Sequence, residues 1–387
     1  MFNIKTYNKI SAIGMKEFDS AKYTIGDDVE APIGAVVRSA ALHDEVFNPE
    51  LLAIARAGAG TNNIPIERCS DEGIIVFNTP GANANAVKEL VIAGLLICSR
   101  KVLPAIEWAK TLKGNGDQVG KMVEKGKSAF AGPEIRGKSI GVVGLGAIGV
   151  LVANAANALG MKVYGYDPYL SLQSAWNLSH NVKRATDLKE IYENCDYISL
   201  HIPLTKDTKG TIDANAFALM KDGVRILNFA RDGLVNSADM IVALESGKVA
   251  AYVVDFPTDE MIGVNGVICI PHLGASTPES EENCAEMAAK QLVEYIEHGN
   301  ITNSVNMPNI SMPRSGKYRI CIIHKNVPNM LTTITTVVAK DNVNIENLLN
   351  KSRGEIAYTM LDVEDCDTET IVNHLKAAEG IIRVRVI

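Results

Sequence analysis

The sequence has few features of a secreted, membrane or nucleic-acid-binding protein. Its seven cysteines are odd in number and form no C-x-x-C pair, which suits free thiols in a reducing compartment better than disulfides or a zinc site. No apolar run reaches transmembrane length, and the N-terminus lacks the apolar core of a signal peptide. The net charge of -7 gives no electrostatic case for binding nucleic acid or a membrane. We therefore expect a cytoplasmic protein with no metal, nucleic-acid or membrane partner.

The chain is long enough for two or three domains. It has 387 residues, and 47% of them are hydrophobic, which is ample for sizeable cores. Short apolar runs alternate with helical patterns up to about residue 96 and again from residue 140, which predicts an α/β fold. Between them, a polar and glycine-rich stretch at 113–132 could be a linker, a surface arm or an oligomer contact. Residues 317–387 show a β-α-β-β-α-β pattern, which predicts a small ferredoxin-like domain.

A glycine-rich motif, Gly-Leu-Gly-Ala-Ile-Gly, occupies residues 144–149. It follows an apolar run at 139–143 that predicts a buried parallel strand, and it precedes small and apolar residues at 150–159 that predict a helix. The dinucleotide-binding motif requires this strand, G-x-G-x-x-G and helix in this order. The alternative is a tight turn in an α/β fold that binds no nucleotide.

Each position of the motif has an expected role. Gly144 permits the tight turn, Gly146 lets the backbone approach a pyrophosphate, and Gly149 lets the helix lie close to the strand. The helix N-terminus at Ala147 and Ile148 then presents free N–H groups to the phosphates. We therefore expect these five residues to bind the cofactor.

An acidic residue ends the next predicted strand, at 162–166. Asp167 lies about 20 residues past the first glycine, as the ribose-binding acid of this motif should. A carboxylate there accepts hydrogen bonds from the ribose 2′-OH and repels a 2′-phosphate, and Pro168 and Tyr169 follow it without an arginine. The sequence therefore predicts NAD rather than NADP as cofactor.

Three polar residues, Arg231, Asp255 and His272, each follow the end of a predicted strand. These strands are predicted at 224–229, 249–254 and 267–270. Ligands of open parallel sheets bind at the carboxyl ends of the strands, so we expect these side chains beside the nicotinamide half of the cofactor. The alternative for each of them is a turn or capping role.

These motifs together resemble those of the NAD-dependent D-2-hydroxyacid dehydrogenases. The resemblance is carried by the glycine motif, by Asn-Phe-Ala-Arg-Asp-Gly at 228–233 and by Pro-His-Leu-Gly-Ala-Ser-Thr at 271–277. It covers essentially the whole chain and is greatest to the short members with a C-terminal ACT domain. It implies a flavodoxin-like substrate-binding domain of residues 1–95 and 285–308, a Rossmann-type NAD-binding domain of residues 96–284 inserted in it, and an ACT domain of residues 317–387.

The resemblance implies oxidation of 3-phospho-D-glycerate to 3-phosphooxypyruvate with NAD, the first step of L-serine biosynthesis, by a homodimer or homotetramer. One alternative is a relative that acts on glycerate, lactate or glyoxylate. The other is a non-catalytic, NAD-sensing regulatory protein of the same fold. L-Serine is the implied effector of the ACT domain, which could instead serve only in assembly.

The resemblance also assigns catalytic roles. His272 is the expected acid/base, since imidazole titrates near working pH, and Arg231 is expected to grip the substrate carboxylate and polarise the C2 oxygen. The family's glutamate lies in an Asp-Val-Phe-x-x-Glu pattern, but Asp255 is followed here directly by Phe-Pro-Thr-Asp-Glu. Counting from Asp255 gives Glu260, whereas aligning on Phe-Pro-Thr gives Asp259. We favour Glu260.

Further binding residues follow from the same motifs. The expected cofactor contacts outside the glycine motif and Asp167 are His201, Pro203, Ala230, Arg231, Asp255, His272 and Gly274. The expected substrate contacts are Arg38, Ser39, Asn83, Arg231 and His272. The expected effector contacts in the ACT domain are His324, Asn326 and Asn344. Asn329 replaces a glycine that the family carries there, and asparagine tolerates the left-handed backbone better than other residues with a side chain.

Overall fold

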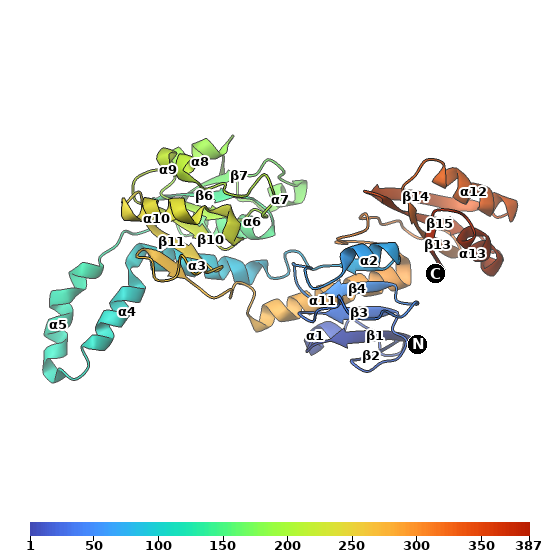
Figure 1. Cartoon of the computed structure of the whole chain (residues 1–387), viewed down its shortest axis with the longest axis horizontal. Coiled ribbons are helices and arrows are strands. Elements are labelled where there is room, and N and C mark those ends of the chain that lie inside the picture. The colour runs from blue at the N-terminus through green and yellow to red at the C-terminus, as the bar shows by residue number, and fades with distance from the viewer. The chain divides into compact units, whose positions relative to one another are not determined.

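The computed structural model describes all residues from 1 to 387 and divides them into two compact units (Figure 1). Unit 1 consists of Met1–Ala82 and Pro278–Ile387, and unit 2 consists of Asn83–Thr277. The chain therefore passes between the units twice, directly after Ala82 and directly before Pro278. None of the helices is both long and apolar enough to cross a membrane.

Unit 1 contains a parallel five-stranded sheet in the order β2-β1-β3-β4-β5. This order is the flavodoxin-like one, as the sequence predicts. Its strands are β1 (Phe2–Tyr7), β2 (Tyr23–Gly26), β3 (Gly34–Val37), β4 (Ala53–Arg56) and β5 (Ile75–Phe77), and its helices are α1 (Ala12–Met15), α2 (Ile66–Asp71) and α11 (Pro278–His298). Helix α11 packs with these strands because its small residues Ala288 and Ala289 are fully buried in the same apolar core as Ile4 and Phe77.

Unit 2 contains a seven-stranded parallel sheet in the order β12-β11-β10-β9-β6-β7-β8. Its strands are β6 (Ser139–Val143), β7 (Lys162–Tyr166), β8 (Lys183–Arg184), β9 (Tyr197–Leu200), β10 (Val224–Asn228), β11 (Val249–Val254) and β12 (Val267–Cys269). Its α-helices are α3 (Ala84–Arg100), α4 (Val102–Thr111), α5 (Val119–Gly126), α6 (Ala147–Ala158), α7 (Leu172–Asn177), α8 (Leu188–Asn194), α9 (Ala214–Leu219) and α10 (Ser237–Glu245). Strands β6 and β9 are buried along their whole length, because helices cover a parallel sheet on both faces.

The polar stretch before β6 forms a helical arm. It contains α5 and the short 3-10 helices η1 (Gly116–Gln118) and η2 (Lys127–Phe130), and Figure 1 shows α4 and α5 projecting together from the rest of unit 2. The rings of Trp108 and Phe130 pack with their centroids 5.2 Å apart. The stretch is therefore a helical surface arm rather than an extended linker, and its use as an oligomer contact stays a prediction.

The C-terminal part of unit 1 is an antiparallel four-stranded sheet in the order β14-β15-β13-β16. Its elements are β13 (Tyr318–Lys325), α12 (Met330–Lys340), β14 (Ile345–Arg353), β15 (Ile356–Val363), α13 (Thr368–Lys376) and β16 (Ile381–Val386). This confirms the predicted ferredoxin-like pattern. Asn329 precedes α12 with a φ of 68°, so asparagine does adopt the left-handed backbone there.

The antiparallel sheet packs directly on the rest of unit 1. Cys321, Ile323 and Tyr358 lie in one apolar core with residues of α11 and of the parallel sheet, and the rings of Tyr358 and Tyr295 are 6.5 Å apart. The guanidinium of Arg383 donates hydrogen bonds to the backbone carbonyls of Pro49, Leu51 and Glu72. The linker between α11 and β13 thus joins two domains that share a core.

Candidate active site

The glycine motif forms a tight turn between β6 and α6. Gly144 has a φ of 91°, and a Cβ there would lie 2.5 Å from the His201 carbonyl oxygen. A Cβ on Gly149 would lie 1.9 Å from the Gly144 carbonyl oxygen, whereas a Cβ on Gly146 would meet nothing within 4 Å. Packing therefore requires glycine at positions 144 and 149. Gly146 instead leaves open space at the N-terminus of α6, which Ala147 and Ile148 form. A pyrophosphate fits in this space.

Asp167 lies at the end of β7 beside a cavity of about 520 Å³. Its Oδ2 accepts a hydrogen bond from the Leu145 N–H and its Oδ1 one from the Tyr169 N–H, both at 2.8 Å. A cavity of this size suits a nucleoside, so the residues present fit the adenosine half of NAD. Arg184 also lines the cavity, a placement that the sequence did not predict because its strand has only two residues.

Arg231, Asp255 and His272 meet at the carboxyl edge of the sheet of unit 2, around one aromatic ring. The centroids of the Phe256 and His272 rings are 4.5 Å apart with an angle of 41° between the rings, and the Arg231 guanidinium carbon lies 5.7 Å from the Phe256 centroid. The side chains of Arg231 and His272 are otherwise exposed. The structure therefore brings together the three residues predicted from the strand ends, and it adds Phe256, which the sequence did not predict.

Asp255 is the buried acid of this group. Its side chain is 1% exposed, and its Oδ1 has no hydrogen-bond partner. Burial raises its pKa to about 6, against the opposing effect of the positive charges of His272 and Arg231. A Cβ on Gly274 would lie 3.3 Å from Asp255 Oδ2, so the loop after His272 passes close to this carboxyl group.

The backbone of the Arg231 turn is held by Asn228, which is fully buried. Its Nδ2 donates to the Arg231 carbonyl oxygen at 2.7 Å, and its Oδ1 accepts from the N–H groups of Ala230 and Arg231. Asn228 belongs to the Asn-Phe-Ala-Arg-Asp-Gly motif, but its position at the end of a strand does not by itself indicate that it holds the following turn.

Asp259 and Glu260, the two candidates for the acid that partners His272, lie in the turn after β11. Both side chains are exposed, and neither makes a hydrogen bond or an ion pair. The choice between them stays a prediction.

The loop after β9 contains His201 and Pro203, and His201 lies beside the glycine turn. The Nε2 of His201 lies 2.8 Å from the Ser199 hydroxyl oxygen, and its Nδ1 is buried without a partner. Burial lowers the pKa of His201 to about 4, so its ring is neutral at pH 7. Its carbonyl oxygen is the atom that forbids a side chain at Gly144.

Unit 1 contributes Arg38 and Ser39, which follow β3. The Nη2 of Arg38 donates to Glu281 Oε1 at 2.6 Å, and both side chains are 43% exposed. The N–H of Ser39 donates to Asn8 Oδ1 at 3.1 Å. Asn83 is the N-cap residue of α3 in unit 2 and makes no capping bond with its side chain. The predicted substrate contacts are therefore divided between the two units.

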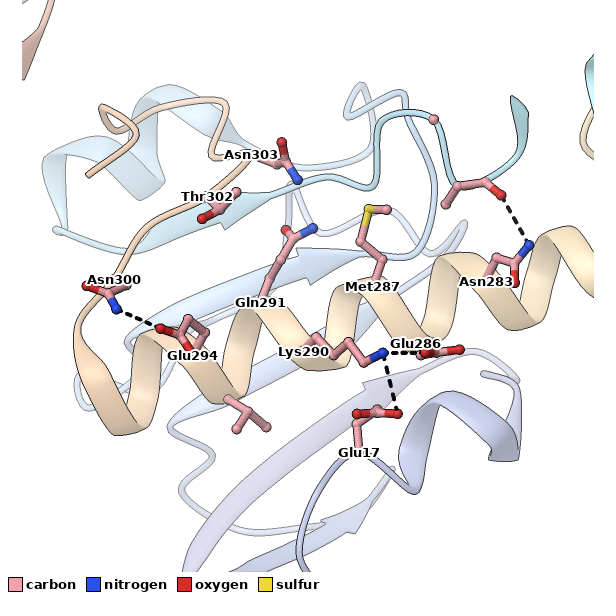
Figure 2. A pocket seen from close by; sticks show the side chains of 13 residues that line it. Glu17, Asn283, Glu286, Met287, Lys290, Gln291, Glu294, Asn300, Thr302 and Asn303 are labelled. Carbon is pink, nitrogen blue, oxygen red and sulfur yellow. Dashed lines mark hydrogen bonds and ion pairs between the residues drawn. The ribbon is translucent and has the colours of Figure 1, made fainter. Parts of the chain in front are cut away.

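A separate cavity of about 760 Å³ lies along α11 in unit 1 (Figure 2). Lys290 there forms ion pairs with Glu17 and Glu286. The carboxamide of Gln291 is buried without a partner, and Figure 2 shows its side chain extending from α11 toward Asn303. None of the predicted site residues lines this cavity.

The predicted effector residues of the ACT domain differ in exposure. His324 is 2% exposed, and its two ring nitrogens lie 2.8 Å from the Lys325 carbonyl oxygen and 2.9 Å from Thr359 Oγ1. Asn326 and Asn344 are exposed, and Asn326 donates to the Gly354 carbonyl oxygen at 2.9 Å. In this structure only the two asparagines present their side chains to solvent.

The nucleotide-type turn, the acid after the second strand and the Arg231–His272 group define an NAD-dependent oxidoreductase. Comparison with protein families gives the particular class. The NAD-binding domain of the D-isomer specific 2-hydroxyacid dehydrogenases matches residues 93–274, and an ACT domain like that of the AHAS small subunit matches residues 320–383. The chain belongs to the D-isomer specific 2-hydroxyacid dehydrogenases. The family and the fold class predicted from the sequence are thus confirmed.

Individual relatives show which members of the family this chain is similar to. D-3-phosphoglycerate dehydrogenase of Haemophilus influenzae is 32% identical over 354 residues, which cover 88% of this chain and 82% of the relative. The enzyme of the same name from Escherichia coli (strain K12) is 32% identical over 363 residues, 89% of this chain and 84% of the relative. The solved structure of NAD+-bound 3-phosphoglycerate dehydrogenase from Entamoeba histolytica matches with a TM-score of 0.60 and 26% identity, over 79% of this chain and 98% of that chain.

Proposed function

We propose that the protein catalyses NAD-dependent oxidation of 3-phospho-D-glycerate to 3-phosphooxypyruvate, the first step of L-serine biosynthesis. The observation that carries this proposal is the similarity to D-3-phosphoglycerate dehydrogenases over more than four-fifths of their length. The fit of the glycine turn and Asp167 to a dinucleotide supports the cofactor.

The residues at the edge of the sheet account for the chemistry. Arg231 binds the substrate carboxylate and polarises the C2 oxygen, for which a planar guanidinium with paired donors is suited. His272 takes the proton of the C2 hydroxyl as the C2–H bond breaks and the carbonyl forms. NAD, when bound, would supply the acceptor for the hydride that leaves C2. The unpaired Oδ1 of Asp255 supports its proposed role as the acceptor of a hydrogen bond from the carboxamide of the cofactor.

Arg38 is the proposed contact for the substrate phosphate, with Ser39 beside it. An acidic protein that binds a dianionic group needs local positive charge, and Arg38 lies at the carboxyl end of a parallel strand, where ligands of such sheets bind. Its ion pair with Glu281 is 43% exposed on both sides, and exposed pairs are weak. A phosphate can therefore compete with Glu281 for the guanidinium.

The match to an ACT domain supports the proposal that L-serine is a feedback inhibitor. Its proposed contacts are Asn326, Asn344 and His324. The proposed assembly is a homodimer or homotetramer in the cytoplasm. Because the ACT sheet shares a core with the parallel sheet of unit 1, an effector bound to it acts on the domain that carries Arg38 and Ser39. Such coupling requires an effector that binds two conformations with different affinity.

The test is the initial rate of NADH formation with 3-phosphoglycerate, D-glycerate and D-lactate, each with and without L-serine. Activity confined to the phosphorylated acid and reduced by serine is expected. Activity on D-glycerate or D-lactate would retain the family chemistry but contradict the phosphate role of Arg38. Binding of NAD without turnover of any acid would favour a regulatory protein of the same fold.

A further inference from the structure

We propose that Phe256 is a positioning residue that holds the catalytic arginine and histidine in their working orientations. Its ring contacts both, since the His272 ring centroid lies 4.5 Å away and the Arg231 guanidinium carbon lies 5.7 Å from the Phe256 centroid. The proposal rests on the proposed function, in which these two side chains act on the same C2 centre.

The geometry of both contacts is attractive. Tilted aromatic pairs with centroids 4.5 to 7 Å apart are favourable beyond the area that they bury. A guanidinium within about 6 Å of a ring centroid is attracted by the electrons of the ring. A single ring therefore restrains two side chains that the rest of unit 2 leaves exposed.

Phe256 is itself fixed on its other sides. The ring is half-buried and packs against the apolar core of unit 2. The preceding residue, Asp255, is 1% exposed and directly follows β11. The ring thus has a rigid base, which a residue that positions others requires.

The local sequence explains why this chain places an aromatic ring here. Asp255 is followed directly by Phe256, without the residue that the family pattern has between its Asp and Phe. The aromatic residue therefore lies immediately after the buried acid, between the loops that carry Arg231 and His272.

Loss of the ring should slow the chemical step more than it weakens binding. Without the contact, both long side chains regain rotamer freedom, and a misplacement of about 1 Å at a catalytic group costs on the order of 100-fold in rate. The proposed pyrophosphate and ribose contacts of NAD, the glycine turn and Asp167, follow β6 and β7, whereas Phe256 follows β11.

The test compares Phe256→Leu, Phe256→Tyr and the control Phe130→Leu. Phe130 is also half-buried and also loses one ring contact, with Trp108. For Phe256→Leu we expect kcat to fall by about 10- to 100-fold, KM for NAD to stay within about twofold, and the primary deuterium isotope effect with C2-deuterated substrate to rise. Phe256→Tyr keeps the ring and should restore kcat, and Phe130→Leu should leave kcat and the isotope effect unchanged.

Two results would overturn the proposal. One is a Phe256→Leu enzyme with unchanged kcat and isotope effect. The other is a crystal structure of Phe256→Leu in which Arg231 and His272 keep the orientations of the wild type. The structure needs no turnover, and the kinetic series uses whichever 2-hydroxy acid the wild type oxidises, so failure of the 3-phosphoglycerate assignment remains distinguishable from failure of the Phe256 proposal.

Discussion

Arg319 and Asp362 form a buried bidentate ion pair in the ACT domain. Arg319 Nε and Nη2 donate to the two carboxylate oxygens of Asp362 at 2.6 and 2.8 Å, and the two side chains are 1% and 0% exposed. Arg319 Nη1 also donates to the His298 carbonyl oxygen at the end of α11, and Asp362 accepts from Ser315. One pair of charges therefore joins two strands of the ACT sheet to the last turn of α11 and to the linker.

Removal of one partner of this pair should destabilise unit 1. Asp362→Asn leaves the Arg319 charge buried without its counterion, for which the expected loss is about 3–5 kcal/mol. The measurement is guanidinium-induced unfolding followed by circular dichroism, with amide exchange in β13 and β15 to report on unit 1, because both tryptophans lie in unit 2. The control is Asp365→Asn, which removes the exposed partner of Lys317 and should leave the transition unchanged. Equal effects of the two substitutions would show that burial does not set the contribution of the ion pair.

The hydrogen bonds of Arg383 are expected to hold the ACT sheet against the rest of unit 1. Arg383→Met removes donors to the carbonyl oxygens of Pro49, Leu51 and Glu72. Each bond from a charged donor contributes about 1.5–3 kcal/mol, so amide exchange in residues 50–52 should accelerate by an order of magnitude or more. Lys376→Met, on the exposed face of α13, is the matched control. Unchanged exchange in Arg383→Met would mean that the shared apolar core alone holds the two sheets.

The fold could be predicted from the sequence to within a few residues, because its elements carry strong local signals. The predicted strand ranges 139–143, 162–166 and 249–254 coincide with β6, β7 and β11, since buried parallel strands are continuous apolar runs between turn residues. The grouping of Arg231 with His272 was also predictable, because the carboxyl ends of neighbouring parallel strands share one edge of the sheet.

The contacts that could not be predicted depend on tertiary packing. The ion pair of Arg38 with Glu281 joins residues 243 positions apart. His324 fits an effector pattern in sequence, but its ring is buried against its own domain. No local signal distinguishes these outcomes, because burial of a polar side chain depends on which element packs over it.

Two glycines of the nucleotide turn should respond differently to substitution. Gly149→Ala places a Cβ 1.9 Å from a backbone oxygen, so α6 must shift, and we expect a loss of about 3 kcal/mol in stability. Gly146→Ala meets nothing within 4 Å and should keep its stability while NAD affinity falls about tenfold or more, because the added methyl group occupies the space for the pyrophosphate. Calorimetric titration with NAD and thermal unfolding of both variants provide the check. Full NAD affinity in Gly146→Ala would contradict the assignment of the pyrophosphate site.

The raised pKa of Asp255 predicts that the stability of the folded protein depends on pH. Its pKa rises from 3.8 to about 6 on folding, so between these values the folded protein binds more protons, and stability falls as pH rises. Above pH 6 the buried charge costs roughly 3 kcal/mol. Asp255→Asn removes this cost, so the variant should be more stable than the wild type at pH 8 and equally stable near pH 4. Urea unfolding of the cofactor-free proteins at the two pH values measures this. A difference that does not change with pH would mean that Arg231 and His272 fully compensate the burial of Asp255.

The choice between Glu260 and Asp259 can be decided by separate amide substitutions. Both side chains are exposed in one turn, so Glu260→Gln and Asp259→Asn should fold alike, and any difference between them reports on catalysis. The acid that faces His272 in the working enzyme favours the protonated imidazole, because a nearby negative charge stabilises the positive form. Its replacement should lower kcat by about 10- to 1000-fold and shift the pH profile of kcat/KM toward lower pH, whereas the other substitution should leave both unchanged.

We expect the large effect in Glu260→Gln. A large effect in Asp259→Asn alone would show that the Phe-Pro-Thr alignment is the correct one. Near wild-type profiles in both variants would leave Asp255 as the carboxylate that serves the histidine, because it is the buried acid whose pKa is lowered by the positive charge of His272.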